Sequence, residues 1–328
     1  MSNPSSKNPP ASAVLSLGEL LQLQPAPKPC LIEPGLLPPQ GIFFCGGEPK
    51  VGKSLLVANM AFCLATGSSR AGFHVSTPRR VLMCQFELPV NLFTARLSCM
   101  RKSIGTAADG YLFVDTRAAG HLLSTPAGLN HFLAAARSAA AEVIILDPLY
   151  SAHDQDENDT RAMSALCQSL LRLRDASKAA LIVVHHIRKS IGRNEIGTAF
   201  RGSSALHAVG DSYMLLTRPS PQLNSVELRF QFRYAPPQQP RLLNLDPDSL
   251  WFVASSQAPR LEITRHKVEI TDVTAALAAI GPLARYNDLR QWIMSQTHCS
   301  KRTAQLAIAE ACRTQSIIQQ DGHYRLPA

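Results

Sequence analysis

The chain has 328 residues, of which 45% are hydrophobic and 17% are charged, and its formal net charge is +9. This composition excludes a disordered or fibrous chain, and the length suffices for one large α/β domain and a small second one. A membrane-spanning protein is also excluded, because no apolar run approaches the roughly 18 residues that a span requires.

The N-terminus, the cysteines and the charge narrow the class further. The first residues are rich in Ser, Pro, Asn and Ala and lack the layout of a signal peptide, which predicts a cytoplasmic protein. The eight cysteines are scattered without a C-x-x-C pair, so we expect buried reduced thiols rather than disulfides or a zinc site. The positive charge suits a nucleic-acid partner, although many basic proteins bind none.

Residues 1–29 are expected to form a flexible segment with one short helix. Residues 1–13 are polar and contain proline, a composition typical of disorder. Residues 14–23 predict an amphipathic helix, and the proline-rich linker at 24–29 follows it. The apolar face of this helix needs a partner surface, either a neighbouring subunit or the chain's own core.

Residues 30–255 alternate apolar strands with helices, which predicts an α/β domain with a mainly parallel sheet and helices on both faces. The last three predicted strands follow one another without helices and indicate an antiparallel extension at one sheet edge. We expect strands at Ile42–Cys45, Val81–Phe86, Tyr111–Asp115, Val143–Asp147, Ala180–His185, Asp211–Leu216, Val226–Tyr234 and Leu250–Val253.

A phosphate-binding loop begins at Gly47, after the strand at 41–45 and before a helical pattern at 55–62. Its spacing G-x-x-x-x-G-K-S is that of a P-loop, so a chance glycine turn is the weaker alternative. Backbone N–H groups close around phosphate oxygens, Lys53 reaches the β- and γ-phosphates, and Ser54 ligates Mg²⁺. The expected nucleotide-binding residues are Gly47, Glu48, Pro49, Lys50, Val51, Gly52, Lys53, Ser54 and Leu55.

Two carboxylates follow apolar strands downstream of this loop. Asp147 ends the run 143–147, the Walker B pattern, and its carboxylate is expected to hold Mg²⁺ through water. Glu87 ends the run 81–87 and should lie beside the γ-phosphate, where it can serve as the catalytic base. A solvated glutamate that starts a helix is the alternative for Glu87.

His185 and His186 end the strand at 180–184. One of the two can hydrogen-bond the γ-phosphate or the attacking water and transmit its loss to the loop that follows. A metal site and an ordinary hydrogen-bonded histidine are the alternatives, but neighbours on a strand point to opposite faces and no further ligand is suitably spaced.

The segment 187–204 leaves this strand and is basic and punctuated by glycine. Such a loop suits single-stranded nucleic acid, because its charges grip backbone phosphates without reading bases, whereas the alternative is a solvated loop. The candidate contacts are Arg188, Lys189, Arg193 and Arg201.

Arg229 and Arg233 alternate with Phe230 and Phe232 on a late strand, so both arginines face one side. A side chain on this face can cross a subunit boundary and stabilise transition-state charge on a neighbour's nucleotide. The alternative is an ordinary exposed strand face.

Residues 256–328 read as a small separate domain. Helices are expected at 269–280, 286–297 and 300–313, followed by a hairpin at 316–326 with Asp-Gly at its turn, a succession that resembles a winged helix. Lys301 and Arg302, in the first turn of the third helix, are DNA-binding candidates. Because much of that helix is apolar, docking of a protein such as a replication-initiation protein competes with duplex DNA.

Several of these motifs together resemble the RecA-fold ATPases of the plasmid RepA helicase type, relatives of the DnaB-like replicative helicases. The motifs are Gly47–Ser54, Gln85–Glu87, Ile144–Leu149, Val184–Lys189 and Arg201–Leu206. The resemblance spans roughly residues 30–255 and implies a ring-forming, hexameric ATPase that uses ATP and Mg²⁺ at sites between subunits, with single-stranded DNA in the central channel.

By residue, the resemblance implies nucleotide and Mg²⁺ binding by Lys53 and Ser54, Glu87 as base, Asp147 as the Walker B residue, His186 as sensor and Arg233 as the preferred finger over Arg229. Asn158 matches a polar, acidic stretch after Walker B. Two features depart from the family: members often carry lysine where this chain has Arg233, and the smallest plasmid helicases lack the winged-helix-like tail.

These patterns predict an ATP-dependent DNA helicase, encoded by a plasmid, phage or integrated element, that moves on single-stranded DNA. A DNA-binding regulatory ATPase, in which ATP only switches assembly, is one alternative. A recombination mediator that forms filaments is another.

Overall fold

The computed structural model describes residues 14–23, 28–157, 159–187, 196, 200, 204–219, 224–255, 268–297, 299–320 and 322–327. The chain divides into two compact units, Met1–Pro259 and Arg260–Ala328, which we call unit 1 and unit 2. Asn158 and the predicted DNA contacts Arg188, Lys189, Arg193 and Arg201 lie outside the described residues.

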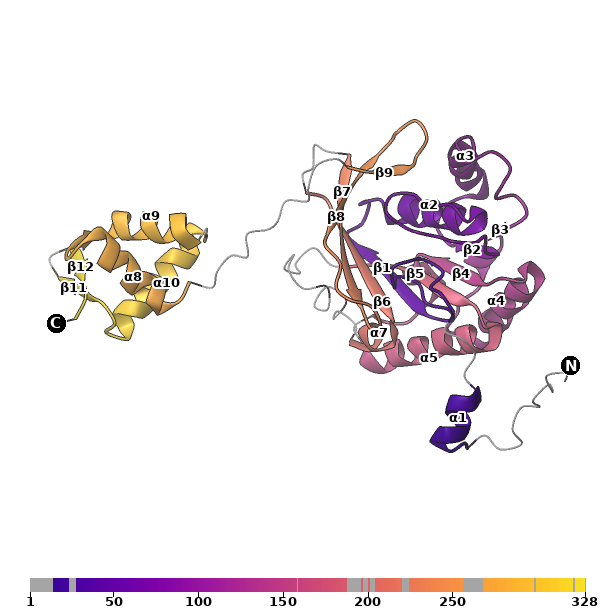
Figure 1. The fold of residues 1–328 in the computed structure, drawn as a ribbon, viewed down its shortest axis with the longest axis horizontal. Helices are drawn as coiled ribbons and strands as arrows, with labels where there is room; N and C mark the ends of the chain where they lie inside the picture. The colour runs from indigo at the N-terminus through magenta and orange to yellow at the C-terminus, as the bar shows by residue number, and fades with distance from the viewer. Residues whose placement is uncertain are drawn as a thin grey trace, which may run out of the picture. The chain divides into compact units, whose positions relative to one another are not determined.

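Unit 1 is built on one nine-stranded sheet in its described part, with the order β3-β2-β4-β5-β1-β6-β7-β8-β9 (Figure 1). The pairs from β3 to β6 are parallel and those from β6 to β9 are antiparallel. The α/β fold with a mainly parallel sheet is therefore confirmed. The strands are β1 (Ile42–Gly47), β2 (Val81–Gln85), β3 (Leu112–Asp115), β4 (Val143–Asp147), β5 (Ala180–His186), β6 (Ser212–Thr217), β7 (Ser225–Phe232), β8 (Arg241–Leu245) and β9 (Phe252–Ala254).

The antiparallel extension differs from the prediction in two respects. The first of the three late strands, β6, pairs in parallel with β1, because the chain before it, which includes helix α7 (Ser204–Val209), supplies the crossover that parallel pairing needs. Strand β8 was missed, since Pro236, Pro237 and Pro240 precede it and conceal a short apolar run. The extension consists of β7, β8 and β9.

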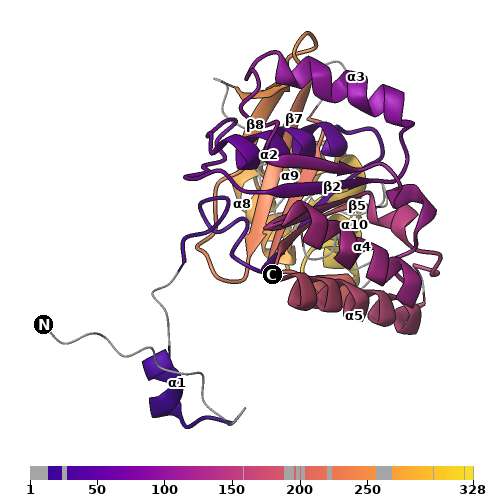
Figure 2. The same cartoon turned by 90° about the vertical axis from the view of Figure 1, so that its right-hand side faces the viewer.

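Helices cover both faces of the sheet, as Figures 1 and 2 show. Strand β1 explains why: Phe43 and Cys45 belong to the hydrophobic cluster under α2, whereas Ile42 and Phe44 belong to the cluster under α5. The first face carries α2 (Lys53–Thr66) and α3 (Val90–Arg101), and the second carries α4 (Pro126–Ala139), α5 (Thr160–Ser177) and α7.

Unit 2 has its own hydrophobic core, which includes Val273, Leu289 and Ile308. The three predicted helices and the hairpin are present. The sequence did not reveal β10, which is only two residues long and completes a three-stranded sheet in the order β10-β12-β11. The elements are α8 (Ile270–Ile280), β10 (Ala284–Arg285), α9 (Tyr286–Thr297), α10 (Lys301–Arg313), β11 (Ile318–Gln320) and β12 (His323–Arg325).

Other expectations concern the termini and the cysteines. The N-terminal helix is present as α1 (Leu17–Leu23). All eight cysteines are free. Within the described ranges, no helix combines the length and the apolar character that a bilayer crossing requires.

Candidate functional site

The loop between β1 and α2 has the backbone that phosphate binding requires. Gly52, directly before α2, has a φ of 110°, in the left-handed region that disfavours other residues. Gly47 passes close to β6, where an added Cβ would lie 2.7 Å from the carbonyl oxygen of Leu216. The sequence thus places glycine where the chain turns and where it is crowded, and α2 begins with Lys53 at the loop's end.

Lys53 is buried, with 4% of its surface exposed, and its hydrogen-bond partners belong to the site itself. Its Nζ donates to the carbonyl oxygens of Gly47, at 2.8 Å, and Glu48, at 2.9 Å. The same Nζ lies 3.1 Å from Nδ1 of His186 at the end of β5. An ammonium group can only donate, so the charged Lys53 requires His186 to accept through Nδ1.

His186 and His185 point to opposite faces of β5, as the strand period predicts. Burial, and then the charge of Lys53, lowers the pKa of His186, which favours its neutral form at the phosphate site. His185 is 6% exposed and faces Phe200, with the ring centroids 6.4 Å apart. Within the described ranges, no three His, Cys, Asp or Glu side chains are placed to hold a metal ion.

Asp147 and Ser54 meet at the end of β4, across the loop from Lys53. Ser54 Oγ donates to Asp147 Oδ1 at 2.9 Å. Asp147 Oδ2 is buried and has no hydrogen-bond partner among the described residues. Burial raises the pKa of Asp147 to about 6, because a dry site disfavours its charged form.

This pair fits a magnesium ion. Mg²⁺ prefers hydroxyl, carboxylate and water oxygens and keeps several of its own waters. The unpartnered Oδ2 would accept from such a water, and the cation would relieve the cost of burying the charge.

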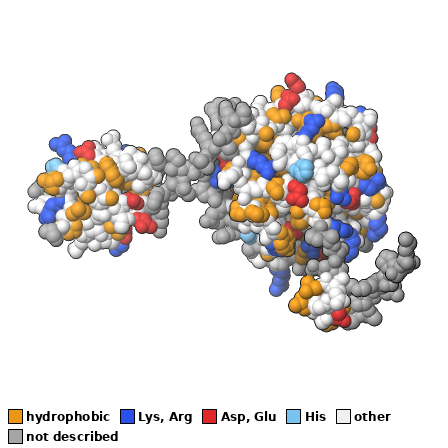
Figure 3. Space-filling view, in the orientation of Figure 1, with side chains coloured by type: hydrophobic (Ala, Val, Ile, Leu, Met, Phe, Trp, Pro, Cys, Tyr) orange, Lys and Arg blue, Asp and Glu red, His pale blue; other side chains and the backbone are white. Residues whose placement is uncertain are grey.

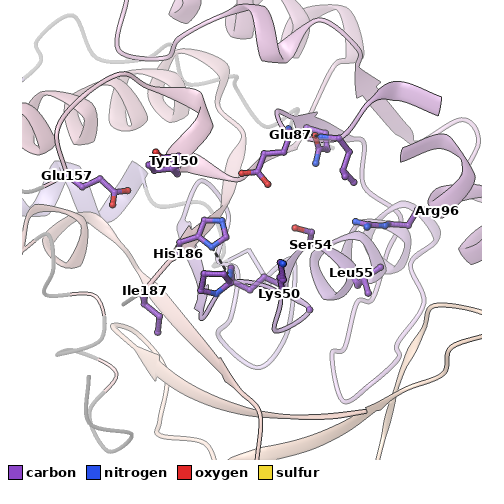
Figure 4. A pocket seen from close by; sticks show the side chains of 14 residues that line it. Lys50, Ser54, Leu55, Glu87, Arg96, Tyr150, Glu157, His186 and Ile187 are labelled. Atoms are coloured by element: carbon purple, nitrogen blue, oxygen red, sulfur yellow. Dashed lines mark hydrogen bonds between the residues drawn. The ribbon is translucent and has the colours of Figure 1, made fainter. Parts of the chain in front are cut away.

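The cavity above the sheet has a volume of about 910 Å³ and is drawn in Figure 4. Glu87 points into it, and its Oε1 accepts from Ser151 Oγ at 3.2 Å. Gln85 shapes the loop below, because its Oε1 accepts from the backbone N–H groups of Glu87 and Leu88 at 2.6 and 2.7 Å. The residues that line the cavity are Pro49, Lys50, Gly52, Lys53, Ser54, Leu55, Gln85, Glu87, Leu88, Arg96, Tyr150, Glu157, His186 and Ile187.

Three side chains of this wall were not anticipated from the sequence: Arg96, Tyr150 and Glu157. Arg96 stands on α3, close enough to Asp147 to lower the pKa of that carboxyl against the larger effect of burial. It forms no ion pair or hydrogen bond with any described residue. A cation nine residues after Glu87 carries no motif, and only the packing of α3 brings it to the cavity.

Arg96→Ala should raise the KM for ATP about tenfold and change kcat less, because a free cation at the wall binds the polyphosphate before and during the reaction. Steady-state ATPase assays measure both constants. Arg101→Ala is the matched control, since Arg101 lies on the same helix but pairs with Asp109 at 2.7 Å. Equal effects of the two substitutions would contradict a specific role for Arg96.

The two candidate fingers are held on the side of β7 opposite Phe230 and Phe232, whose stacked rings lie 6.0 Å apart. Arg229 Nε donates to Glu227 Oε1 at 2.7 Å, and the Arg229 side chain is 18% exposed. Arg233 lies just past the strand, donates to the Ala208 carbonyl at 2.8 Å and is 45% exposed. Neither belongs to the wall of the cavity in its own chain.

Comparison with known proteins identifies relatives of unit 1. The sequence profile of the AAA domain family matches residues 6–191. No curated protein matches the sequence. The chain is similar in structure to a protein solved as an isolated ATPase domain, with a TM-score of 0.51, 15% identity and coverage of 66% of this chain and 85% of that one.

A second similar structure is a DnaB-like replicative helicase that was solved for its interactions with primase. The TM-score is 0.52 at 15% identity, over 66% of this chain and 57% of that one. The matched region thus spans a little over half the length of that helicase. These matches confirm the RecA-like P-loop ATPase fold that the sequence predicts.

Proposed function

The chain belongs to the AAA domain family, and from that membership we propose that it is an ATP-dependent DNA helicase that moves on single-stranded DNA. One observation carries the proposal: Lys53, Glu87 and His186 face a single cavity beside the Ser54–Asp147 pair. This set contains a phosphate-binding cation, a general base, a phosphate sensor and the ligands for a divalent cation.

Binding of the triphosphate would exchange the partners of Lys53. Its ammonium group now bonds two loop carbonyls and His186, and phosphate oxygens are stronger acceptors for it. When Lys53 turns to the phosphates, Nδ1 of His186 loses its donor. His186 ends β5, and the basic segment 187–204 follows, so the occupancy of the site is coupled to the predicted DNA loop.

Glu87 would accept a proton from the attacking water, and Ser151 orients its carboxylate through the 3.2 Å hydrogen bond. Mg²⁺ bound at Ser54 and Asp147 would offset the charge on the β- and γ-phosphates. Loss of the γ-phosphate would let Lys53 return to His186. We propose that this exchange moves the DNA contacts Arg188, Lys189, Arg193 and Arg201, in a homo-hexamer encoded by a plasmid, phage or integrated element.

A forked-duplex assay tests this function. The purified chain should hydrolyse ATP faster with single-stranded DNA and should unwind the fork, whereas the Lys53→Ala variant should do neither. A regulatory ATPase would bind duplex DNA and unwind nothing. A recombination mediator would form filaments rather than closed rings in negative-stain images of the ATP-bound protein.

Arg233 is the preferred finger, because it is exposed while Arg229 is held in a largely buried pair with Glu227. Arg233→Ala should lower kcat by about 10³ without loss of nucleotide binding. Mixing it with Lys53→Ala subunits should restore activity, because about a quarter of the interfaces then combine an intact loop with an intact finger. Arg229→Ala, mixed in the same way, is the control, and recovery there instead would assign the finger to Arg229.

A further inference from the structure

Unit 2 contains two consecutive helices with a short connection. Residues 298–300 separate α9 from α10, and Ser300 caps α10 by accepting the N–H of Thr303 at 3.2 Å. Both helices pack with α8 around one hydrophobic core, and the three-stranded sheet adjoins them. A helix–turn–helix of this kind places its second helix in the major groove of DNA.

The apolar residues of α10 serve this core. Ala304, Ile308 and Ala311 have exposed fractions of 0%, 2% and 0%, and their spacing of four and three residues defines one helical face. The sequence of α10 suggested a surface for protein docking, but most of its apolar character is used within the unit. Leu306, which is 63% exposed, is the large apolar side chain that remains outside.

The outer face of α10 is polar and basic at its beginning. Lys301, Arg302 and Gln305 are exposed, and none forms an ion pair or a side-chain hydrogen bond with the described residues. The one acidic residue of the helix, Glu310, is neutralised by Arg313 through hydrogen bonds of 2.8 and 2.5 Å. Net positive charge is therefore concentrated at the end of the helix that a helix–turn–helix presents to base edges.

The small sheet adds two more basic side chains. Arg285 on β10 is exposed, and Arg325 lies on β12, the strand that pairs with β10. Figure 3 shows Lys and Arg side chains on the face of unit 2 that it draws. A sheet strand with arginine suits the phosphate backbone, which fixes the position of a protein on the duplex without reading sequence.

We propose that unit 2 is a winged-helix module that binds duplex DNA, with α10 in the major groove. Lys301 and Arg302 contact phosphates or guanine edges, Gln305 reads an adjacent base, and Leu306 contacts a thymine methyl group. The charge of the face decides for DNA over a protein partner. In combination with the proposed helicase, on which the biological use of this module rests, unit 2 anchors the motor on duplex DNA beside the single strand.

Fluorescence anisotropy of the full-length chain on a blunt duplex of about 25 base pairs, titrated over several salt concentrations, tests the proposal. The triple variant Lys301→Ala, Arg302→Ala, Gln305→Ala should bind at least about tenfold more weakly, and the slope of log Kd against log salt should fall by about 2, since two cations are lost. Arg313→Ala, on the same helix but paired with Glu310, should change the affinity less than about twofold.

Two further measurements separate this proposal from the proposed function. The triple variant should keep its ATPase activity on single-stranded DNA, and Lys53→Ala should keep duplex binding. A helicase that fails to unwind but still binds duplex through α10 would leave this inference intact. An unchanged Kd and an unchanged salt slope in the triple variant would overturn it, and loss of duplex binding in Arg313→Ala alone would do the same.

Discussion

Glu87→Gln should stop ATP hydrolysis while the protein still binds nucleotide. Glutamine keeps the shape of the side chain, and its oxygen can still accept from Ser151, so the loop held by Gln85 should not move. What is lost is the group that accepts the proton of the attacking water. General bases contribute about 10² to 10⁴ to a rate, and we expect kcat to fall by about 10³.

Single-turnover hydrolysis with bound ATP measures the chemical step, and fluorescent nucleotide titration measures binding, for which the Kd should change less than about threefold. Glu48→Gln is the matched control, because it removes a carboxylate from the exposed part of the same loop. If Glu87→Gln retains the rate, Glu157 becomes the candidate base, since it is the other carboxylate in the wall of the cavity apart from the loop itself.

The parts of the site that were predictable are those that covalent order brings together. A strand, a glycine turn and a helix follow one another at Gly47–Ser54, so the phosphate cradle can be read from spacing. Asp147 was also accessible, because a buried strand that ends in a carboxylate delivers it to the edge where the loop lies. Each depends on one local pattern.

The contacts that could not be predicted depend on which strands are neighbours. Strand β1 lies between β5 and β6, which are far from it in sequence, and this order brings His186 to Lys53. Arg96 arrives through the packing of α3, and Tyr150 and Glu157 through the path of the chain after β4. Side chains placed by such tertiary packing leave no period or motif in the sequence.

The same limit applies to the late strands and to unit 2. Prolines before β8 and the two-residue length of β10 hide strands that exist because neighbouring strands offer free edges. On α10, by contrast, the sequence showed the alanines but not their direction. The buried positions of Ala304 and Ala311 change the balance between a protein partner and DNA.

Asp147→Asn should raise the melting temperature of the nucleotide-free protein and remove Mg²⁺-dependent hydrolysis. Burial raises the pKa of Asp147 from 3.8 to about 6. The folded state thus binds the proton more tightly than the unfolded state, and this stabilisation is lost as the pH rises from about 4 to about 6. The two pKa values differ by about 2, and each unit corresponds to about 1.4 kcal/mol, so the ionised carboxylate costs about 3 kcal/mol above pH 6.

Asparagine keeps an oxygen for Ser54 and carries no charge, so the variant should avoid this cost. For a domain of this size we expect a gain of about 5 to 10 °C at pH 8, measured by differential scanning calorimetry, and a gain near zero at pH 4. Mg²⁺ and nucleotide should stabilise the natural protein more than the variant, because the charge that is costly alone becomes favourable beside the cation. A lower melting temperature of the variant at every pH would mean that the carboxylate stabilises the fold itself. The expected pattern would instead show that Asp147 is retained at a cost in stability because the phosphate site requires it.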